Sequence, residues 1–164
     1  MAKLERNKFM QFVSFDGTDW EVLGVDNDDL SKELNPDTET SKNVLGETTF
    51  KHNGYEPEVS VDPYYADSSS VLYEDLSTVA LEEKYDDTSI KGYYAEGILT
   101  TVDSTAGTIT GTGKKREAYI VPQSIGGDTA GLGIPFNVNP IGPMTNVTIT
   151  YTVATRAVTI AAST

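Results

Sequence analysis

The sequence contains no cysteine and a single histidine, His52, in 164 residues. The absence of cysteine excludes disulfide bonds, thiolate catalysis and cysteine-ligated metal sites. One histidine beside Asn53-Gly54, without a second histidine or any cysteine, makes a transition-metal site or a nucleophile–histidine pair hard to build. We therefore expect His52 to be a turn or surface residue.

Long apolar runs are also missing. Residues 1–8 carry several charges but are not followed by an apolar stretch of signal-peptide length. No later run approaches the length of a membrane span. We therefore expect the chain to fold in a cytoplasm and not to insert into a membrane.

Positive charge is scarce, with 12 Lys and Arg against 25 Asp and Glu and a net charge of −13. A chain this acidic repels nucleic acid phosphates, so specific DNA binding is not expected. Most acids lie between Asp16 and Asp87, and from Ala118 onward the charged side chains are Asp128 and Arg156. We expect much of this nearly uncharged stretch to be covered, either by the core or by another copy of the protein.

Strand patterns dominate what is present, and the length suits one domain over residues 1–164. Near the C-terminus, apolar residues alternate strictly with threonines from Val147 to Val153, which predicts a terminal β-hairpin with its turn at residues 154–156. Earlier strands are expected at residues 9–15, 20–25, 48–52, 58–61, 90–102, 108–112 and 118–121.

One segment, residues 68–83, has a helical pattern. The apolar residues that share one face of it are Leu72, Leu76, Val79 and Ala80. Asp67 or one of the serines after it is placed to cap the helix. Residues 26–46 are polar and interrupted by Asn35-Pro36, which predicts a long loop. We therefore predict a mainly β protein, an antiparallel β-sandwich or partly open barrel with one flanking α-helix.

Local patterns that resemble known chemical sites are incomplete. Residues 110–115 lack the first Gly and the Ser/Thr of a phosphate loop, and we interpret them as a hairpin tip with a basic patch. Asp26 starts a calcium-loop pattern, but Ser31 and Asp37 stand where Gly and Glu are needed. Carboxylate pairs are too frequent in this acidic chain to indicate a glycosidase. We predict no enzymatic activity, no cofactor and no metal site.

Three stretches carry a family resemblance. They are Gly54-Tyr-Glu-Pro-Glu-Val-Ser-Val-Asp-Pro-Tyr-Tyr-Ala66 followed by Leu72-Tyr-Glu-Asp-Leu76, then Gln123-Ser-Ile-Gly-Gly-Asp-Thr-Ala-Gly131 followed by Ile134-Pro-Phe136, and Asn35-Pro-Asp-Thr-Glu-Thr-Ser-Lys-Asn-Val-Leu-Gly46. In order and spacing they resemble the tail tube (major tail) proteins of phages that infect Gram-positive bacteria. Residues 142–164 depart from that family, because they are less polar and poorer in lysine.

The resemblance implies a structural virion protein with the phage tail tube fold. Six copies would form a ring whose inward strands close a continuous β-barrel, and rings would stack into the hollow tube through which DNA passes into the host. Other implied partners are a tape measure protein in the lumen during assembly and, in tails that have one, a sheath protein. The protein would be assembled in the bacterial host cytoplasm and end in the virion tail.

The resemblance also implies where subunits touch. The long loop would reach a neighbouring subunit or the next ring. The residues expected at contacts between subunits or rings are Leu34, Asn35, Pro36, Val44, Leu45, Gln123, Gly126, Gly127, Asp128 and Thr129. Acidic side chains in the lumen would repel the phosphate backbone of the passing DNA.

A second interpretation stays open at this point, a monomeric β-sandwich binding module of carbohydrate-binding or adhesin type. In that case Trp20 and the tyrosines would form ligand platforms instead of packing the core. Rings or tubes of purified protein would favour the first interpretation, and sugar binding by a stable monomer would favour the second.

Overall fold

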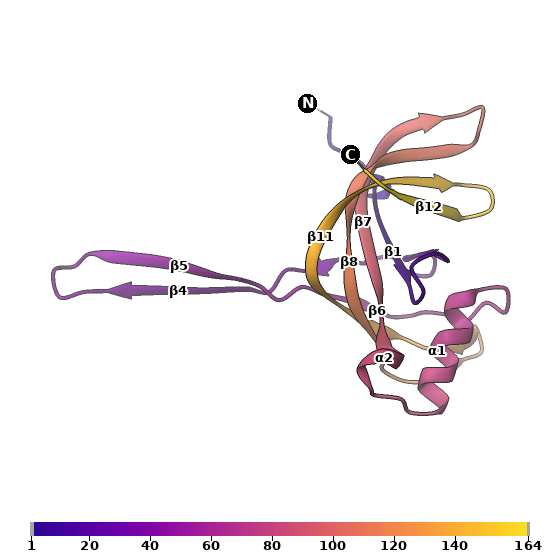
Figure 1. Ribbon diagram of the computed structural model, residues 1–164, viewed down its shortest axis with the longest axis horizontal. Helices are drawn as coiled ribbons and strands as arrows, with labels where there is room; N and C mark the ends of the chain where they lie inside the picture. Colours follow the sequence, from indigo (N-terminus) through magenta and orange to yellow (C-terminus); the bar gives the residue numbers. More distant parts are fainter. Residues whose placement is uncertain (1, 164) are drawn as a thin grey trace.

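The computed structural model describes residues 2–163, and its main feature is an eight-stranded antiparallel sheet (Figure 1). Its strands are β1 (Phe9–Ser14), β2 (Glu21–Val22), β3 (Lys32–Glu33), β6 (Glu58–Val61), β7 (Lys91–Asp103), β8 (Thr108–Pro122), β11 (Phe136–Thr152) and β12 (Ala157–Ala162). They are ordered β2-β1-β7-β8-β11-β6-β3, and β12 pairs with β11. The expected mainly β, antiparallel fold with few helices is confirmed.

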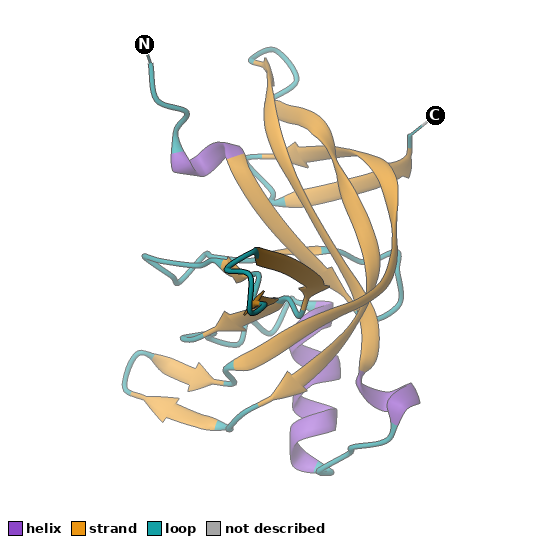
Figure 2. Cartoon of the chain, turned by 90° about the vertical axis from the view of Figure 1, so that its left-hand side faces the viewer, coloured by secondary structure: helices purple, strands orange, loops and turns teal. Residues whose placement is uncertain are grey.

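Two further hairpins and the helices complete the chain. A long hairpin of β4 (Pro36–Lys42) and β5 (Thr48–Tyr55), called the arm below, projects far from the body on the side opposite the helices (Figure 1). A short hairpin joins β9 (Gly126–Asp128) to β10 (Gly131–Gly133). The helices α1 (Val71–Leu81) and α2 (Asp87–Ile90) lie at one end of the long strands (Figure 2), and a 3₁₀ turn spans Arg6–Lys8.

Helix α1 occupies the centre of the segment where a helix is expected. The hydroxyl oxygen of Ser70 accepts a hydrogen bond from the Tyr73 amide and so caps the first turn. Leu72, Leu76 and Val79 are buried, as the helical spacing predicts. Burying a leucine side chain completely contributes about 1.5–3 kcal/mol, so packing against the sheet stabilises this short helix. The four-residue helix α2 is too short to produce a periodic pattern and was not expected.

The core consists of two clusters on opposite faces of the sheet. One cluster includes Val13, Tyr94 and Phe136 together with the apolar face of α1. The other includes Phe12 and Ile149 together with partly buried residues of β2 and β12. Because Phe12 and Val13 are neighbours in sequence and point to opposite faces, β1 is buried on both sides.

Strand β11 changes the face that it buries halfway along its length. In its first half the buried residues are Phe136, Val138 and Pro140, and in its second half they are Val147 and Ile149. Even-numbered and odd-numbered residues of a strand point to opposite faces. The half of the sheet near α1 is therefore covered on one face, and the half near β12 on the other.

Two local predictions are wrong. Residues 26–46 are not one long loop, because they contain β3 and β4. Residues 110–115 are not a hairpin tip, because they lie inside β8. There Gly111 and Gly113 permit close contact with β7: an added Cβ would come within 2.4 Å of the Ile98 carbonyl oxygen and 2.0 Å of the Glu96 carbonyl oxygen, respectively.

Candidate assembly surfaces

The arm is exposed on both faces along nearly its whole length. A two-stranded hairpin by itself is marginally stable in water, because it buries little apolar surface. Seven registered pairs nevertheless join β4 to β5, from Pro36↔Tyr55 to Lys42↔Thr48. The arm is therefore an ordered element that lacks a covering partner within residues 2–163.

The tip of the arm holds two apolar side chains in water. The side-chain oxygen of Asn43 accepts hydrogen bonds from the backbone amides of Leu45 at 2.9 Å and Glu47 at 3.0 Å. Gly46 closes the turn with a φ of 81°, a conformation that glycine adopts without strain. Val44 is fully exposed and Leu45 is 79% exposed. The turn thus presents these side chains on a fixed backbone, which reduces the backbone entropy lost when they are covered.

An aromatic stripe runs along one face of the arm. The rings of His52 and Tyr55 lie 4.6 Å apart, and Phe50 is on the same face by strand alternation. The opposite face carries an exposed ion pair between Glu39 and Lys51. Sequence reasoning missed this stripe, although the spacing of Phe50 and His52 by two residues is the signal that could have revealed it.

The root of the arm is held to the body by polar contacts. Asn35 has a φ of 44° and donates from its side-chain amide to the Glu56 carbonyl oxygen at 3.0 Å. Just before it, Lys32 on β3 forms an ion pair with Glu96 on β7. Leu34 stays 46% exposed between these contacts. The predicted residues Leu34, Asn35 and Pro36 therefore lie at the root of the arm, and Val44 and Leu45 at its tip.

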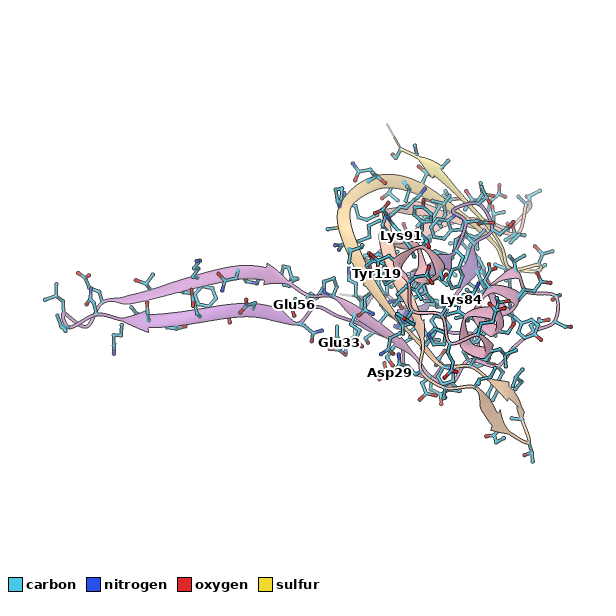
Figure 3. The ribbon with its side chains drawn as sticks, turned by 60° about the horizontal axis from the view of Figure 1, so that its bottom comes forward. Asp29, Glu33, Glu56, Lys84, Lys91 and Tyr119 are labelled. Carbon is cyan, nitrogen blue, oxygen red and sulfur yellow. The ribbon has the colours of Figure 1, made fainter. Side chains whose placement is uncertain are left out.

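The second predicted group lies on the β9–β10 hairpin and the chain that leads into it. The residues in this group are Gln123, Gly126, Gly127, Asp128 and Thr129, and all are exposed. The Asp128 side chain accepts from the Ala130 amide at 2.9 Å, which shapes the turn. Figure 3 shows the arm and this hairpin projecting from different sides of the body. The two groups thus form two separate surfaces and not one site.

Two strand edges near the far end of the sheet are unpaired within residues 2–163. Strand β12 pairs with β11 alone, and β7 pairs with β1 only as far as Ile98. We call the four-stranded region between these edges the blade; it comprises residues 98–103, 108–112, 148–152 and 157–161. Val102 on its β7 edge is 59% exposed. Open edges are templates for pairing with another chain. Sequence reasoning could not locate them, because an edge is defined by which strands pair.

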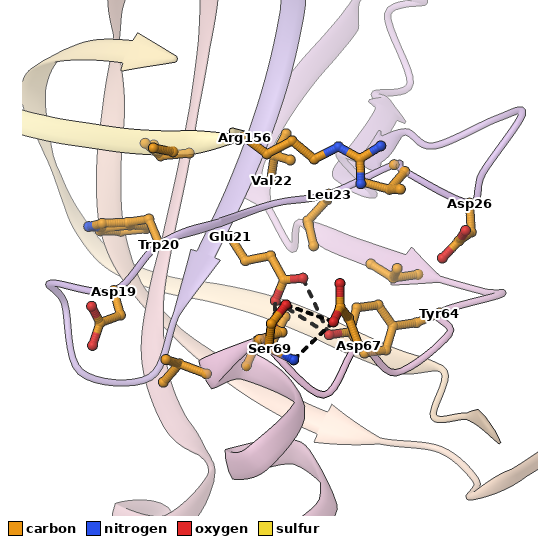
Figure 4. A pocket seen from close by; sticks show the side chains of 18 of the residues that line it. Asp19, Trp20, Glu21, Val22, Leu23, Asp26, Tyr64, Asp67, Ser69 and Arg156 are labelled. Atoms are coloured by element: carbon orange, nitrogen blue, oxygen red, sulfur yellow. Dashed lines mark hydrogen bonds between the residues drawn. The ribbon is translucent and has the colours of Figure 1, made fainter. Parts of the chain in front are cut away.

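A cleft of about 590 Å³ lies between β2, the start of α1 and the turn between β11 and β12 (Figure 4). In it a Glu21 carboxylate oxygen accepts hydrogen bonds from the Ser70 hydroxyl at 2.6 Å and the Tyr64 hydroxyl at 3.3 Å. Burial raises the pKa of Glu21, and burial followed by the Glu21 charge raises that of Tyr64. The backbone amide of Ser69 and then its hydroxyl donate to Asp67 and lower the pKa of that carboxyl group.

These contacts connect β2 to the start of α1. Trp20 also lines the cleft, but its ring packs against the second core cluster and its Nε1 donates to the Gly17 carbonyl oxygen at 3.2 Å. The indole therefore packs against the core, whereas the binding-module interpretation expects it to form a platform for a ligand. We call this contact among Glu21, Tyr64 and Ser70 the joint, because it connects β2 to the start of α1.

Within residues 2–163, no three or more His, Asp or Glu side chains are grouped so that they could hold a metal ion. No helix in the same range is long and apolar enough to cross a membrane. His52 is an exposed residue of β5.

The sequence matches no protein-family model, and it matches none of the curated proteins with which it was compared.

Proposed function

We propose that the protein is a structural subunit that assembles with copies of itself into rings and that these rings stack into a hollow tube of the phage tail tube type. The arm is the observation that carries this proposal. Its tip exposes Val44 and Leu45 on an ordered turn, and its aromatic stripe is also in water. Apolar side chains grouped on a projecting element are typical of a surface that another molecule covers.

The open edges of the blade support the same proposal. Pairing the β12 edge of one copy with the β7 edge of the next would satisfy the unpaired backbone groups of both strands. An edge of each kind on every subunit is the requirement for a head-to-tail contact, and such contacts close into rings when the rotation permits. A neighbour is therefore a suitable partner for these edges, and the arm remains free to contact another subunit or ring.

Two of the three stretches that resemble tail tube proteins lie on projecting elements, whereas the stretch from Gly54 to Leu76 lies mainly in β6 and α1. Residues 35–46 form half of the arm and its tip, and residues 123–131 lead into and form most of the β9–β10 hairpin. In the body of the protein the joint at Glu21 is occupied by internal hydrogen bonds. The features that suit assembly therefore lie on surface elements and not in an internal cavity.

The test is electron microscopy of the purified protein by negative staining over a range of concentration and salt. The proposal predicts rings or hollow tubes for the unmodified chain. A double variant, Val44→Ser with Leu45→Ser, should fold normally, because both residues are exposed, but should not form tubes. Leu81→Ser is the matched control, since Leu81 is 71% exposed and is the last residue of α1. This helix lies away from the arm (Figure 1).

Monomeric particles under all conditions would overturn the proposal. If the Val44 and Leu45 double variant formed tubes as well as the unmodified chain does, the arm would not take part in the contact between subunits. Specific sugar binding by a stable monomer would instead favour the binding-module interpretation.

A further inference from the structure

One face of the blade is a regular array of threonines. Directly paired residues of neighbouring strands point to the same face of a sheet, so the strand register defines rows across the blade. The middle row contains one threonine from each of its four strands, Thr101, Thr110, Thr150 and Thr159. The adjacent rows are Ile98, Thr112, Thr148 and Ala161 on one side and Asp103, Thr108, Thr152 and Ala157 on the other.

This threonine face, defined as these three rows, is turned away from the second core cluster. The opposite face of the same strands carries Leu99, Val147 and Ile149, which are buried in the second cluster. The threonines are exposed or half-buried, and their hydroxyl groups make no hydrogen bond to another group within residues 2–163. Nothing in the described part of the chain covers them.

The threonine face is nearly free of charge although the chain has a net charge of −13. Asp103 is the one charged residue in its three rows. The row beyond Thr112 contains Lys114 and Glu96, where Lys114 hydrogen-bonds to Asn146 and Glu96 pairs with Lys32. Charged side chains therefore lie in the row next to the threonine face, and Lys114 and Glu96 both already have polar partners.

We infer that the threonine face lines the lumen of the tube and that its partner is a hydrated polyanion, such as duplex DNA, which it allows to pass without holding it. This inference rests on the proposed function. The rows run across the strands, and the rows of Thr101 and Asp103 end at the two open edges. Joining those edges between copies would continue these two rows around the ring, and the middle row would become a closed belt of threonines.

The chemistry of the face suits passage and not binding. Its rows contain no Lys or Arg that would form ion pairs with phosphates. They contain no aromatic ring on which bases could stack. Short hydroxyl side chains can remain bonded to water, which separates a moving polymer from the wall. The result is a nearly neutral wall, with Asp103 as the one charged residue in its three rows, which differs from the acid-lined lumen expected from the sequence.

Accessibility of single cysteines tests the orientation, because the native chain has no cysteine. Thr150→Cys is treated with a small maleimide and with a maleimide attached to a large polyethylene glycol, before and after assembly. The small reagent should label both states, and labelling by the large reagent should be lost on assembly. The reference variant is Lys84→Cys, an exposed position at the α1 end of the molecule (Figure 3), which should react with both reagents in both states.

The outcomes separate this inference from the proposed function. If no tubes form, the proposed function fails. If tubes form and the large reagent labels Thr150→Cys in them as fast as in free subunits, the inference is overturned while the proposed function stands.

Charge placed on the threonine face tests the partner. Tubes of Thr150→Lys should retain short duplex DNA at low salt and release it at high salt, whereas unmodified tubes should retain none. If Thr150→Lys does not assemble, Thr112→Lys in the adjacent row serves as the second variant. DNA held by unmodified tubes at low salt, or none held by an assembled lysine variant, would overturn the role of the neutral wall.

Discussion

Lys32 on β3 and Glu96 on β7 form an ion pair whose side chains are only 18% and 14% exposed, and this pair ties the root of the arm to the middle of the sheet. The other Glu96 carboxylate oxygen accepts from the Tyr94 hydroxyl at 3.0 Å. That hydroxyl in turn accepts from the Gln11 side-chain amide at 2.9 Å. A polar chain through the sheet thus links β1, β7 and β3.

Glu96→Gln should destabilise the subunit, because it leaves the Lys32 ammonium partly buried without a counter-charge. We expect a loss of about 2 kcal/mol, between the values typical of exposed and of buried ion pairs. Urea unfolding of the unassembled subunit measures it. The matched control is Glu39→Gln, which breaks the pair with Lys51, where the side chains are 62% and 68% exposed. There the loss should not exceed about 1 kcal/mol, and equal losses in the two variants would contradict the importance of the polar chain.

Glu21 should make the subunit less stable as pH rises. Burial raises its folded-state pKa above the ordinary value of 4.5, so the folded state binds this proton more tightly than the unfolded state does. The free energy of unfolding therefore decreases as pH rises through the raised pKa, and this penalty is absent below pH 4.5. Glu21→Gln should remove the penalty, so its stability relative to the unmodified chain should increase from pH 4.5 to pH 7.

Urea unfolding at both pH values measures this difference, and Glu83→Gln, which changes an exposed carboxylate after α1, is the control. A stability difference between Glu21→Gln and the unmodified chain that does not change with pH would show that the joint tolerates the charged form without penalty.

Gly113→Ala should be strongly destabilising. Its Cβ would lie 2.0 Å from the Glu96 carbonyl oxygen, and the paired strands β7 and β8 would have to separate. Overpacking of this kind costs about 1–3 kcal/mol or more. Gly126→Ala is the control, because an added Cβ there meets nothing within 4 Å and its φ is not positive. Thermal unfolding of the unassembled variants gives the comparison, and similar melting temperatures would mean that the close approach of β7 and β8 is relaxed in solution.

Shortening the arm should leave the body intact. A variant in which Asn-Gly replaces residues 39–51 retains the Thr38↔His52 pair and closes it with a tight turn. Because the removed residues are exposed, the urea midpoint of the subunit should stay the same within error, while tube formation should be lost. Analytical centrifugation and microscopy measure assembly. A clear fall in the midpoint would show that the arm contributes to the fold of its own subunit.

The sequence predicts the strands and the helix that have one face against the core and the other in water. The alternation at Val147, Ile149 and Tyr151 predicts the hairpin of β11 and β12, and the helical spacing of Leu72 and Leu76 predicts α1. The arm lacked such a signal. Both of its faces are in water, so Thr, Ser, Glu and Lys occupy both and no apolar period arises.

The candidate surfaces were predictable only in part. The resemblance pointed to residues 35–46 and 123–131, and the structure places them on two projecting hairpins. The open edges and the threonine face depend on strand order and register across distant segments, which a single sequence does not specify. Thr110 and Thr150 are forty residues apart in the chain, and only the pairing of β8 with β11 makes them neighbours.

The exchange of buried faces within β11 restricts how the chain can change in length. Residues 142–146 are exposed and join a half that buries even-numbered residues to a half that buries odd-numbered ones. Inserting one residue there would turn Val147 and Ile149 toward water and the threonines toward the core, because successive side chains alternate. Inserting two would keep both faces in place. During divergence, this segment should therefore gain or lose residues in pairs.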